Sequence, residues 1–260
     1  MHATDSAGQT WAGRTFKPNP FAGDDGSALP ATAAALALPT VPERLTAVVE
    51  ALRTERVLVP VVAHEHPGRE ADGAVAAHVT HKSGDPAGDA CASAAMVSVR
   101  THDERAALPV FSSSAAMRAW NPEARPVPVE GARAAQAAVV ETDGLMVLDP
   151  GAEHPVLVGR PAVVALATGE PWVAPWDDED LAASLVRLLT PVGGLVGVRL
   201  EPGRTAETRV LLAVREGASR SRVSTAIGAA HGLLGQDPVV RARVDSLEIA
   251  PVQVRATVGD

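Results

Sequence analysis

The spacing of apolar residues changes several times along the chain, and each change predicts a different secondary structure. Over residues 42–53 the apolar side chains recur every three to four positions, which is typical of one face of a helix. Residues 56–63 (RVLVPVVA) then form a run of β-branched side chains, which predicts a buried strand. Because Pro60 lies inside this run, we expect the strand to lie at a sheet edge or to contain a bulge.

Strand-like and helix-like segments continue to alternate as far as residue 168. Serine before a first turn, proline within it and glycine after a last turn mark the ends of the predicted helices. The pattern predicts strands at residues 94–100, 108–111 and 144–148, and helices at residues 112–120, 131–140 and 161–168.

The last third of the chain is predicted to contain a helix, two strands, a second helix and a final strand, in that order. Four consecutive acidic residues open the first helix, where negative charge is stabilised by the helix dipole. A Glu-Pro-Gly turn joins the first two strands into a hairpin. We therefore expect an antiparallel sheet with two helices over one face. The predicted elements are a helix from residue 177 to 189, strands at 194–200 and 208–215, a helix at 219–234 and a strand at 247–254.

Composition along the chain divides these elements between two regions. The fold class predicted is α/β (α+β): two small domains, each with a mixed or antiparallel sheet and helices packed on it. The segment EPWVAPW, with two prolines and two tryptophans, is the best candidate for a domain boundary. We expect a partly disordered N-terminal arm at residues 1–40, a first domain at 41–170 with a mobile loop at 64–92, a linker at 171–177 and a second domain at 178–257.

Overall composition excludes several classes of protein. The chain has 260 residues, a net charge of -8 and one cysteine, which excludes an internal disulfide and Cys-based zinc or iron–sulfur sites. The acidic balance argues against nucleic-acid binding. No apolar run is long enough to span a bilayer, and the N-terminus lacks the pattern of a secretory signal, so we expect a cytoplasmic protein with no membrane partner.

Two groups of residues are candidates for chemistry. His64, His66, His78 and His81 have spacings that could bind a metal ion, but they flank a low-complexity loop that cannot hold coordination geometry without support. Ser112, Ser113 and Ser114 lie between a strand and a helix, as hydrolase nucleophiles do, but the glycines of a nucleophile elbow are missing around them. We therefore expect solvated histidines, a serine that caps a helix, no catalytic residues and no cofactor.

Aromatic side chains are few, with 4 Trp, 3 Phe and no Tyr, and their positions are informative. Most of them lie in the arm and in the linker, outside the predicted helices and strands. Rare aromatics in such segments favour contacts with another protein or between domains. The predicted interaction surface comprises Trp11, Phe16, Phe21, Phe111, Trp120, Trp172 and Trp176.

Several segments together resemble the SseB protein family. The segment LPVFSSSAAMRAW at residues 108–120 is similar to the strand-to-helix step of that family, with its downstream Trp, and GLMVLDPG at 144–151 is similar to the turn that follows a later strand. Asp149 stands where relatives commonly carry Asn. The arm at residues 11–26 resembles the leader of actinobacterial members, and residues 181–254 resemble the C-terminal domain of the family. The resemblance implies a two-domain α/β protein without established catalytic residues.

These observations favour a non-enzymatic protein that acts through protein–protein contacts or as a regulatory module. The partner is an unknown protein, and a homo-oligomer is possible. One alternative is a sensor of a small ligand such as an amino acid, because regulatory ligand-binding modules share the order of elements in the second domain. The other alternative is a metal-dependent enzyme that uses the loop histidines.

Overall fold

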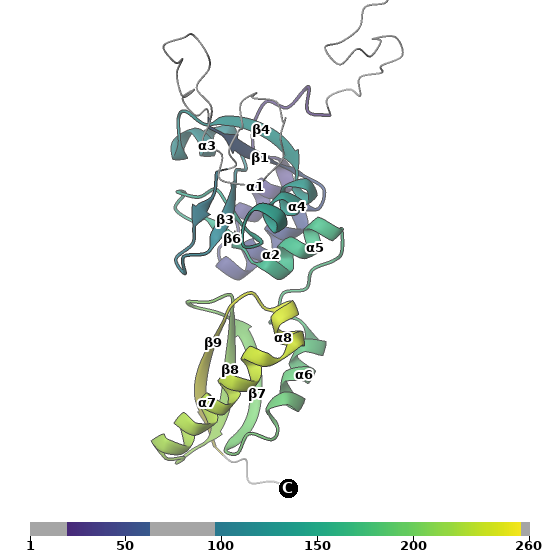
Figure 1. Ribbon diagram of the computed structural model, residues 1–260. Helices are drawn as coiled ribbons and strands as arrows, with labels where there is room; N and C mark the ends of the chain where they lie inside the picture. The colour runs from purple at the N-terminus through teal and green to yellow at the C-terminus, as the bar shows by residue number, and fades with distance from the viewer. Residues whose placement is uncertain (1–19, 63–96, 256–260) are drawn as a thin grey trace, which may run out of the picture.

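The computed structural model describes residues 20–62 and 97–255, which form two lobes (Figure 1). We call residues 20–62 and 97–170 the N-terminal lobe, and residues 177–255 the C-terminal lobe. Each lobe has its own hydrophobic core, and each core packs helices against a sheet. The fold is therefore α/β, with small sheet-and-helix units, as the sequence predicts.

A four-stranded mixed sheet forms the centre of the N-terminal lobe. Its strand order is β2-β3-β5-β6, and the central pair β3 and β5 is parallel while both outer pairs are antiparallel. Of these strands, β6 was not predicted, because three residues are too short a run to show a period. The bounds are β2 (Val99–Arg100), β3 (Ala106–Val110), β5 (Leu145–Leu148) and β6 (Val156–Val158).

A second, two-stranded sheet pairs β1 (Arg56–Val61) with β4 (Arg125–Glu130), which the sequence did not lead us to expect. The sequence of β4 is RPVPVE, and alternating prolines are unusual in a strand. The backbone N–H and C=O of Leu58 both bond to Phe111, on the side of β1 away from β4. Leu58 therefore makes no backbone hydrogen bond to Pro128, its neighbour on β4. The nitrogens of both prolines of β4 therefore face the open edge, where no ladder bond is lost.

Five helices cover the sheets of the N-terminal lobe. The second helix begins with a capping box. The Thr40 side chain accepts from the backbone N–H of Glu43, and the Glu43 side chain accepts from the backbone N–H of Thr40. The fifth ends at Gly169, which adopts a left-handed conformation. Their bounds are α1 (Pro30–Leu36), α2 (Val41–Leu52), α3 (Ser114–Trp120), α4 (Gly131–Glu141) and α5 (Arg160–Thr168).

The described part of the predicted arm is tied to this lobe by a buried ion pair. Nε and Nη2 of Arg56 donate to the Asp24 carboxylate at 2.5 and 2.7 Å, and Nη1 donates to the carbonyl of Ser112 at 2.8 Å. These bonds hold the pKa of Asp24 below its usual value. Glu55 adds a second anchor by accepting from the backbone of Ala31 and Thr32 at the start of α1.

The C-terminal lobe has a three-stranded sheet in the order β7-β8-β9. Helices α6 and α7 lie on the same face of this sheet (Figure 1), and α8 joins their core. The expectation of an antiparallel sheet was wrong for one pair, because β8 and β9 are parallel. Helices α7 and α8 return the chain to the starting end of β8, so β9 runs in the same direction. The bounds are α6 (Glu179–Leu189), β7 (Leu195–Pro202), β8 (Thr208–Arg215), α7 (Arg220–Gln236), α8 (Pro238–Arg243) and β9 (Leu247–Val254).

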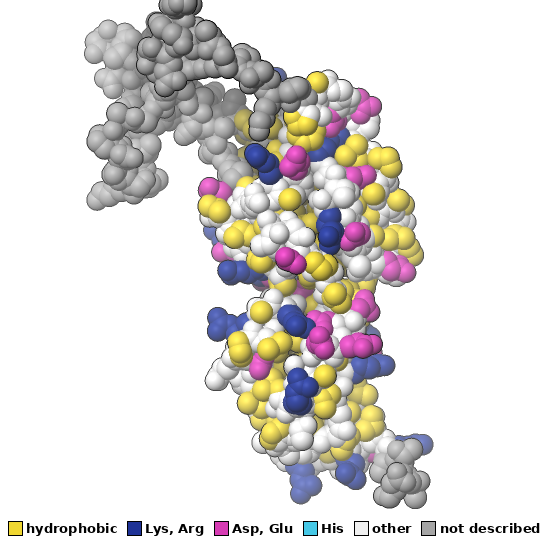
Figure 2. Space-filling model, turned by 90° about the vertical axis from the view of Figure 1, so that its right-hand side faces the viewer, with side chains coloured by type: hydrophobic (Ala, Val, Ile, Leu, Met, Phe, Trp, Pro, Cys, Tyr) yellow, Lys and Arg dark blue, Asp and Glu magenta, His cyan; other side chains and the backbone are white. Residues whose placement is uncertain are grey.

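The two lobes meet at a narrow waist, where charged side chains of both signs gather (Figure 2). Arg105, beside β3, forms a two-bonded ion pair with Asp245 of the other lobe, with distances of 2.8 and 2.7 Å. Asp245 also accepts from the backbone N–H of Arg160 at 3.1 Å, so it caps α5 from across the junction. Trp176, in the linker, packs against the cores of both lobes.

Replacing Arg56 with Met should lower the free energy of unfolding by about 3–5 kcal/mol, because it leaves the Asp24 carboxylate and a buried carbonyl without their donor. Urea denaturation measures this loss. Arg53→Met is the matched control, since Arg53 forms an exposed pair with Glu50 at 3.7 Å, and it should cost less than about 1 kcal/mol. Equal costs for the two variants would contradict the anchoring role.

Gly159→Ala should separate the lobes without unfolding either one. A Cβ at Gly159 would lie 2.6 Å from the Cβ of Asp245, which is closer than two non-bonded carbon atoms can approach. Small-angle scattering should show a larger radius of gyration for this variant, while circular dichroism stays unchanged. The control is Gly228→Ala on α7, where the added Cβ has open space, and this variant should keep the original radius.

Candidate functional site

The structure places the predicted aromatic residues in different environments. Phe111 is fully buried, with its ring centroid 5.3 Å from that of Trp120, so it is part of the core and cannot contact a partner. The linker side chains of Trp172 and Trp176 are half-buried against the cores. Phe21 is also half-buried. Trp11, Phe16 and the four histidines at positions 64, 66, 78 and 81 lie outside the described residues.

Ser112 belongs to a buried polar pair at the carboxyl ends of the parallel strands β3 and β5. Its backbone N–H and its hydroxyl donate to the two oxygens of Asp149 at 2.8 and 2.6 Å. Burial raises the pKa of Asp149. In the part of the chain that the structure describes, no histidine hydrogen-bonds to Ser112, and both of its donors hold Asp149 at the turn after β5.

An open sheet edge in the C-terminal lobe offers a different kind of site. The N–H of Gly203 donates to the carbonyl of Glu207 at 2.9 Å, which fixes the alternation of backbone directions along β7. By this alternation, the backbone groups of Val198 and Leu200 point away from β8. They have no hydrogen-bond partner among the described residues, so they can accept an additional strand.

The other long edges of the described sheets are blocked by proline. Ser246 and Val254 bond to β8 through their carbonyls, so the odd-numbered residues of β9 point outward, and Pro251 is one of them. On β4 the prolines also point outward, as shown above. Proline has no N–H to offer an incoming strand, and edge prolines prevent unwanted pairing. On β7 only Pro202, at the far end, plays this role.

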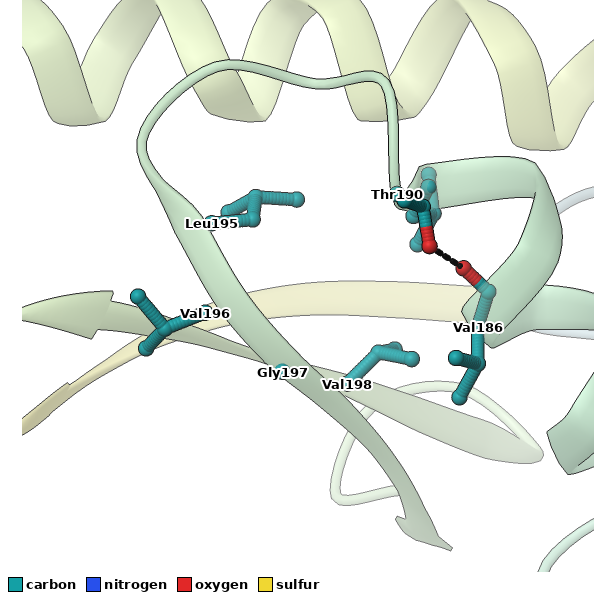
Figure 3. Close-up of a pocket in the computed structure, with 7 residues that line it drawn as sticks. Val186, Thr190, Leu195, Val196, Gly197 and Val198 are labelled. Carbon is teal, nitrogen blue, oxygen red and sulfur yellow. Dashed lines mark hydrogen bonds between the residues drawn. The ribbon is translucent and has the colours of Figure 1, made fainter. Parts of the chain in front are cut away.

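An apolar pocket of about 200 Å³ lies beside this edge, between β7 and the end of α6 (Figure 3). The side chains of Leu195 and Val198 point from the strand toward the helix, where Val186 and Thr190 lie. The Thr190 hydroxyl donates to the Val186 carbonyl at 2.6 Å, and the same carbonyl accepts from the Thr190 N–H at 3.0 Å. Val186 is 50% exposed, although it is aliphatic and borders the pocket.

Local sequence explains why strand and helix diverge to leave this pocket. Asp178 caps α6 by accepting from the N–H of Leu181 at 2.9 Å, which starts the helix beside the waist. Gly194 adopts a positive φ of 96° and turns the chain tightly into β7. The register of β7 then shifts between Leu195 and Gly197, and such a bulge bends the strand. We call the edge of β7 and this pocket together the β7 groove.

Sequence reasoning missed the β7 groove, although some signals are present. The strand itself was predicted, and Val186 stands out as an apolar residue on the polar side of its helix. Nothing local reveals which strands are neighbours, so an edge cannot be distinguished from a centre. Arg199 and Glu201 pair with each other on the outer face of β7 and contribute nothing to the pocket.

Neither a metal site nor a membrane helix is present within the described ranges. Histidine, cysteine and acidic side chains do not converge there in groups of three or more that could hold a metal ion. Each described helix is too short or too polar to cross a membrane.

Fold and site together define a two-lobed α/β protein with an open strand edge beside an apolar pocket. The family model of the SseB protein N-terminal domain matches residues 29–165, which is more than half of the chain, and the chain therefore belongs to the SseB family. No curated protein matches the chain. No solved structure matches it either.

Asp149→Asn should raise the free energy of unfolding at pH 7. Asp149 has a φ of 52°, which Asn tolerates. The amide oxygen can accept from the Ser112 N–H and the amide nitrogen can donate to the Ser112 hydroxyl oxygen, so both contacts persist without a buried charge. Because the folded-state pKa of Asp149 is raised, its ionisation destabilises the fold as pH rises through that pKa. The advantage of Asn should therefore disappear below about pH 4, which urea denaturation at several pH values can measure.

Asp149→Ala is the matched comparison. It should cost about 2–4 kcal/mol at every pH, because alanine is strained at a positive φ and leaves the Ser112 N–H without an acceptor. If the Asn variant were less stable than the wild type at pH 7, a required charge at this position would replace our interpretation.

Proposed function

We propose that the chain is a non-enzymatic interaction module that binds an extended segment of a partner protein in the β7 groove. The observation that carries this proposal is the open edge of β7 beside an apolar pocket, whereas the edges of β4 and β9 carry outward prolines. Strand addition of this kind derives affinity from main-chain bonds and specificity from pockets for alternate side chains.

The geometry sets requirements for the bound segment. It would lie beside Val198 and Leu200 and exchange backbone hydrogen bonds with them. Its alternate side chains would face α6, and one aliphatic side chain would enter the pocket between Val186 and Leu195. The segment must therefore be extended, free of proline at the paired positions, and aliphatic at one central position.

Other assignments belong to the same proposal. Residues 178–257 form the C-terminal domain of the SseB family, which the hairpin and the final strand with its IAPV sequence support. We further propose an actinobacterial, cytoplasmic protein that requires no cofactor and binds no nucleic acid, in keeping with the acidic composition. The half-buried Trp120, Trp172 and Trp176 hold the lobes in shape, and the partner surface is the β7 groove.

Selection of random heptapeptides on the full chain tests this function. Enriched peptides should carry an aliphatic residue flanked by residues with high strand propensity, and their binding can be measured by fluorescence anisotropy. Val186→Lys, at the pocket, should weaken binding by about tenfold or more. Val198→Pro should also weaken peptide binding, because it removes the backbone N–H that points away from β8 and leaves the hydrogen bonds between β7 and β8 in place.

The matched control is Val140→Lys on α4, which replaces a valine that is 77% exposed and distant from the groove. This variant should bind the selected peptides as the wild type does. Amide resonances of Val198 and Leu200 should shift on binding. Peptides that bind all three variants equally well would place the partner surface elsewhere.

A further inference from the structure

A second cavity, of about 260 Å³, lies between the two lobes and is separate from the β7 groove. One wall is apolar and comes mainly from α2 and the linker, with Val41, Leu45 and Trp176. Val41 is 67% exposed, whereas Leu45 is buried behind it. The facing wall is polar and comes from the segments before β8 and β9, where Glu207 and Asp245 lie. We call this cavity the interlobe cleft.

Glu207 is the unusual group in the interlobe cleft. Its Oε2 accepts from the backbone N–H of Asp245 at 2.8 Å. Its Oε1 is buried and has no hydrogen-bond partner, and it faces Gly159, where an added Cβ would come within 2.9 Å of it. Burial raises the pKa of Glu207 to about 7, and the neighbouring Asp245 charge contributes to the increase. An unsatisfied carboxyl oxygen in such a place lowers stability unless a donor fills it.

The charges around Glu207 leave it without a cation of its own. Asp245 is the partner of Arg105, which also bonds to Asp103 at 2.6 Å. Arg204 and His102 line the cleft but are exposed, and neither hydrogen-bonds to Glu207. The described residues thus satisfy Asp245 and leave Glu207 as the one carboxyl group of the cleft that lacks a charged donor.

We propose that the interlobe cleft binds a small ligand that carries an ammonium or amidinium group on an apolar body. The charged nitrogen lies in the cleft against the Glu207 carboxyl group, while the apolar body packs against Trp176 and Val41. Because the two walls belong to different lobes, an occupied cleft holds the lobes together. The site is distinct from the β7 groove, and the proposal does not depend on it.

Benzylammonium is a suitable probe, and benzyl alcohol and benzoate share its ring without its charge. In nitrogen–proton NMR spectra of the full chain, benzylammonium should shift the indole resonance of Trp176 in a saturable manner. Benzyl alcohol and benzoate should bind about tenfold more weakly or worse. Equal shifts from all three compounds would show an apolar pocket without charge recognition and would overturn the proposal.

Variants and pH separate the role of Glu207 from general electrostatic attraction. Glu207→Gln should weaken benzylammonium binding about tenfold or more, whereas Glu201→Gln, on β7 outside the cleft, should change it less than about twofold. Raising the pH from 6 to 8 should tighten binding to the wild type by about tenfold, since Glu207 ionises over this interval. Binding that is independent of pH, or equal in the two variants, would overturn the assignment of Glu207. A circular dichroism spectrum of Glu207→Gln that matches the wild-type spectrum would show that any loss of binding is not due to unfolding.

Discussion

The buried carboxylate of Asp245 is the interaction on which the arrangement of the two lobes depends. Its side chain is 2% exposed, yet it lies in a short segment between α8 and β9 that has no regular structure. A buried charge persists only when it is paired and hydrogen-bonded, and here all three hydrogen bonds to the carboxylate are donated by the other lobe. Arg105 and the start of α5 supply those donors, so the charge of Asp245 sets how the lobes meet. Gly159 completes this junction, because its missing side chain lets Asp245 and Glu207 approach the start of α5 closely.

The treatment of sheet edges is the second organising constraint. A row of unpaired backbone groups attracts other strands, so proteins block such edges or use them. In the described part of this chain, outward prolines block β4 and β9, while a bulge and a glycine turn shape β7 without closing it. The contrast gives the β7 groove its significance, because the same chain uses proline at comparable positions elsewhere. Its neighbour α6 adds an apolar side that main-chain bonds alone could not provide.

The candidate site could be read from the sequence only in part. Aromatic residues were rare enough to draw attention, but Phe111 is buried and Trp120 packs against it, because a lobe built from Val, Leu and Ala uses its large rings to fill the core. The position of Trp176 between two cores agrees with its place in a Pro-rich linker. Val186, Glu207 and Asp245 gave no signal of comparable strength, since an exposed valine or an isolated acid is ordinary until its neighbours are known.

The sequence by itself determined the local elements of this protein. Most helices and strands of the described residues follow from the apolar period, capping residues and turn chemistry, which act over a few positions. Several segments together, residues 108–120 and 144–151 among them, indicated the family. Only the tertiary structure decided the strand order, the parallel pairing of β8 with β9, and the meeting of Arg105 with Asp245, 140 residues apart. These features depend on which surfaces bury one another. That choice is made by the packing of the whole chain, and no local pattern records it.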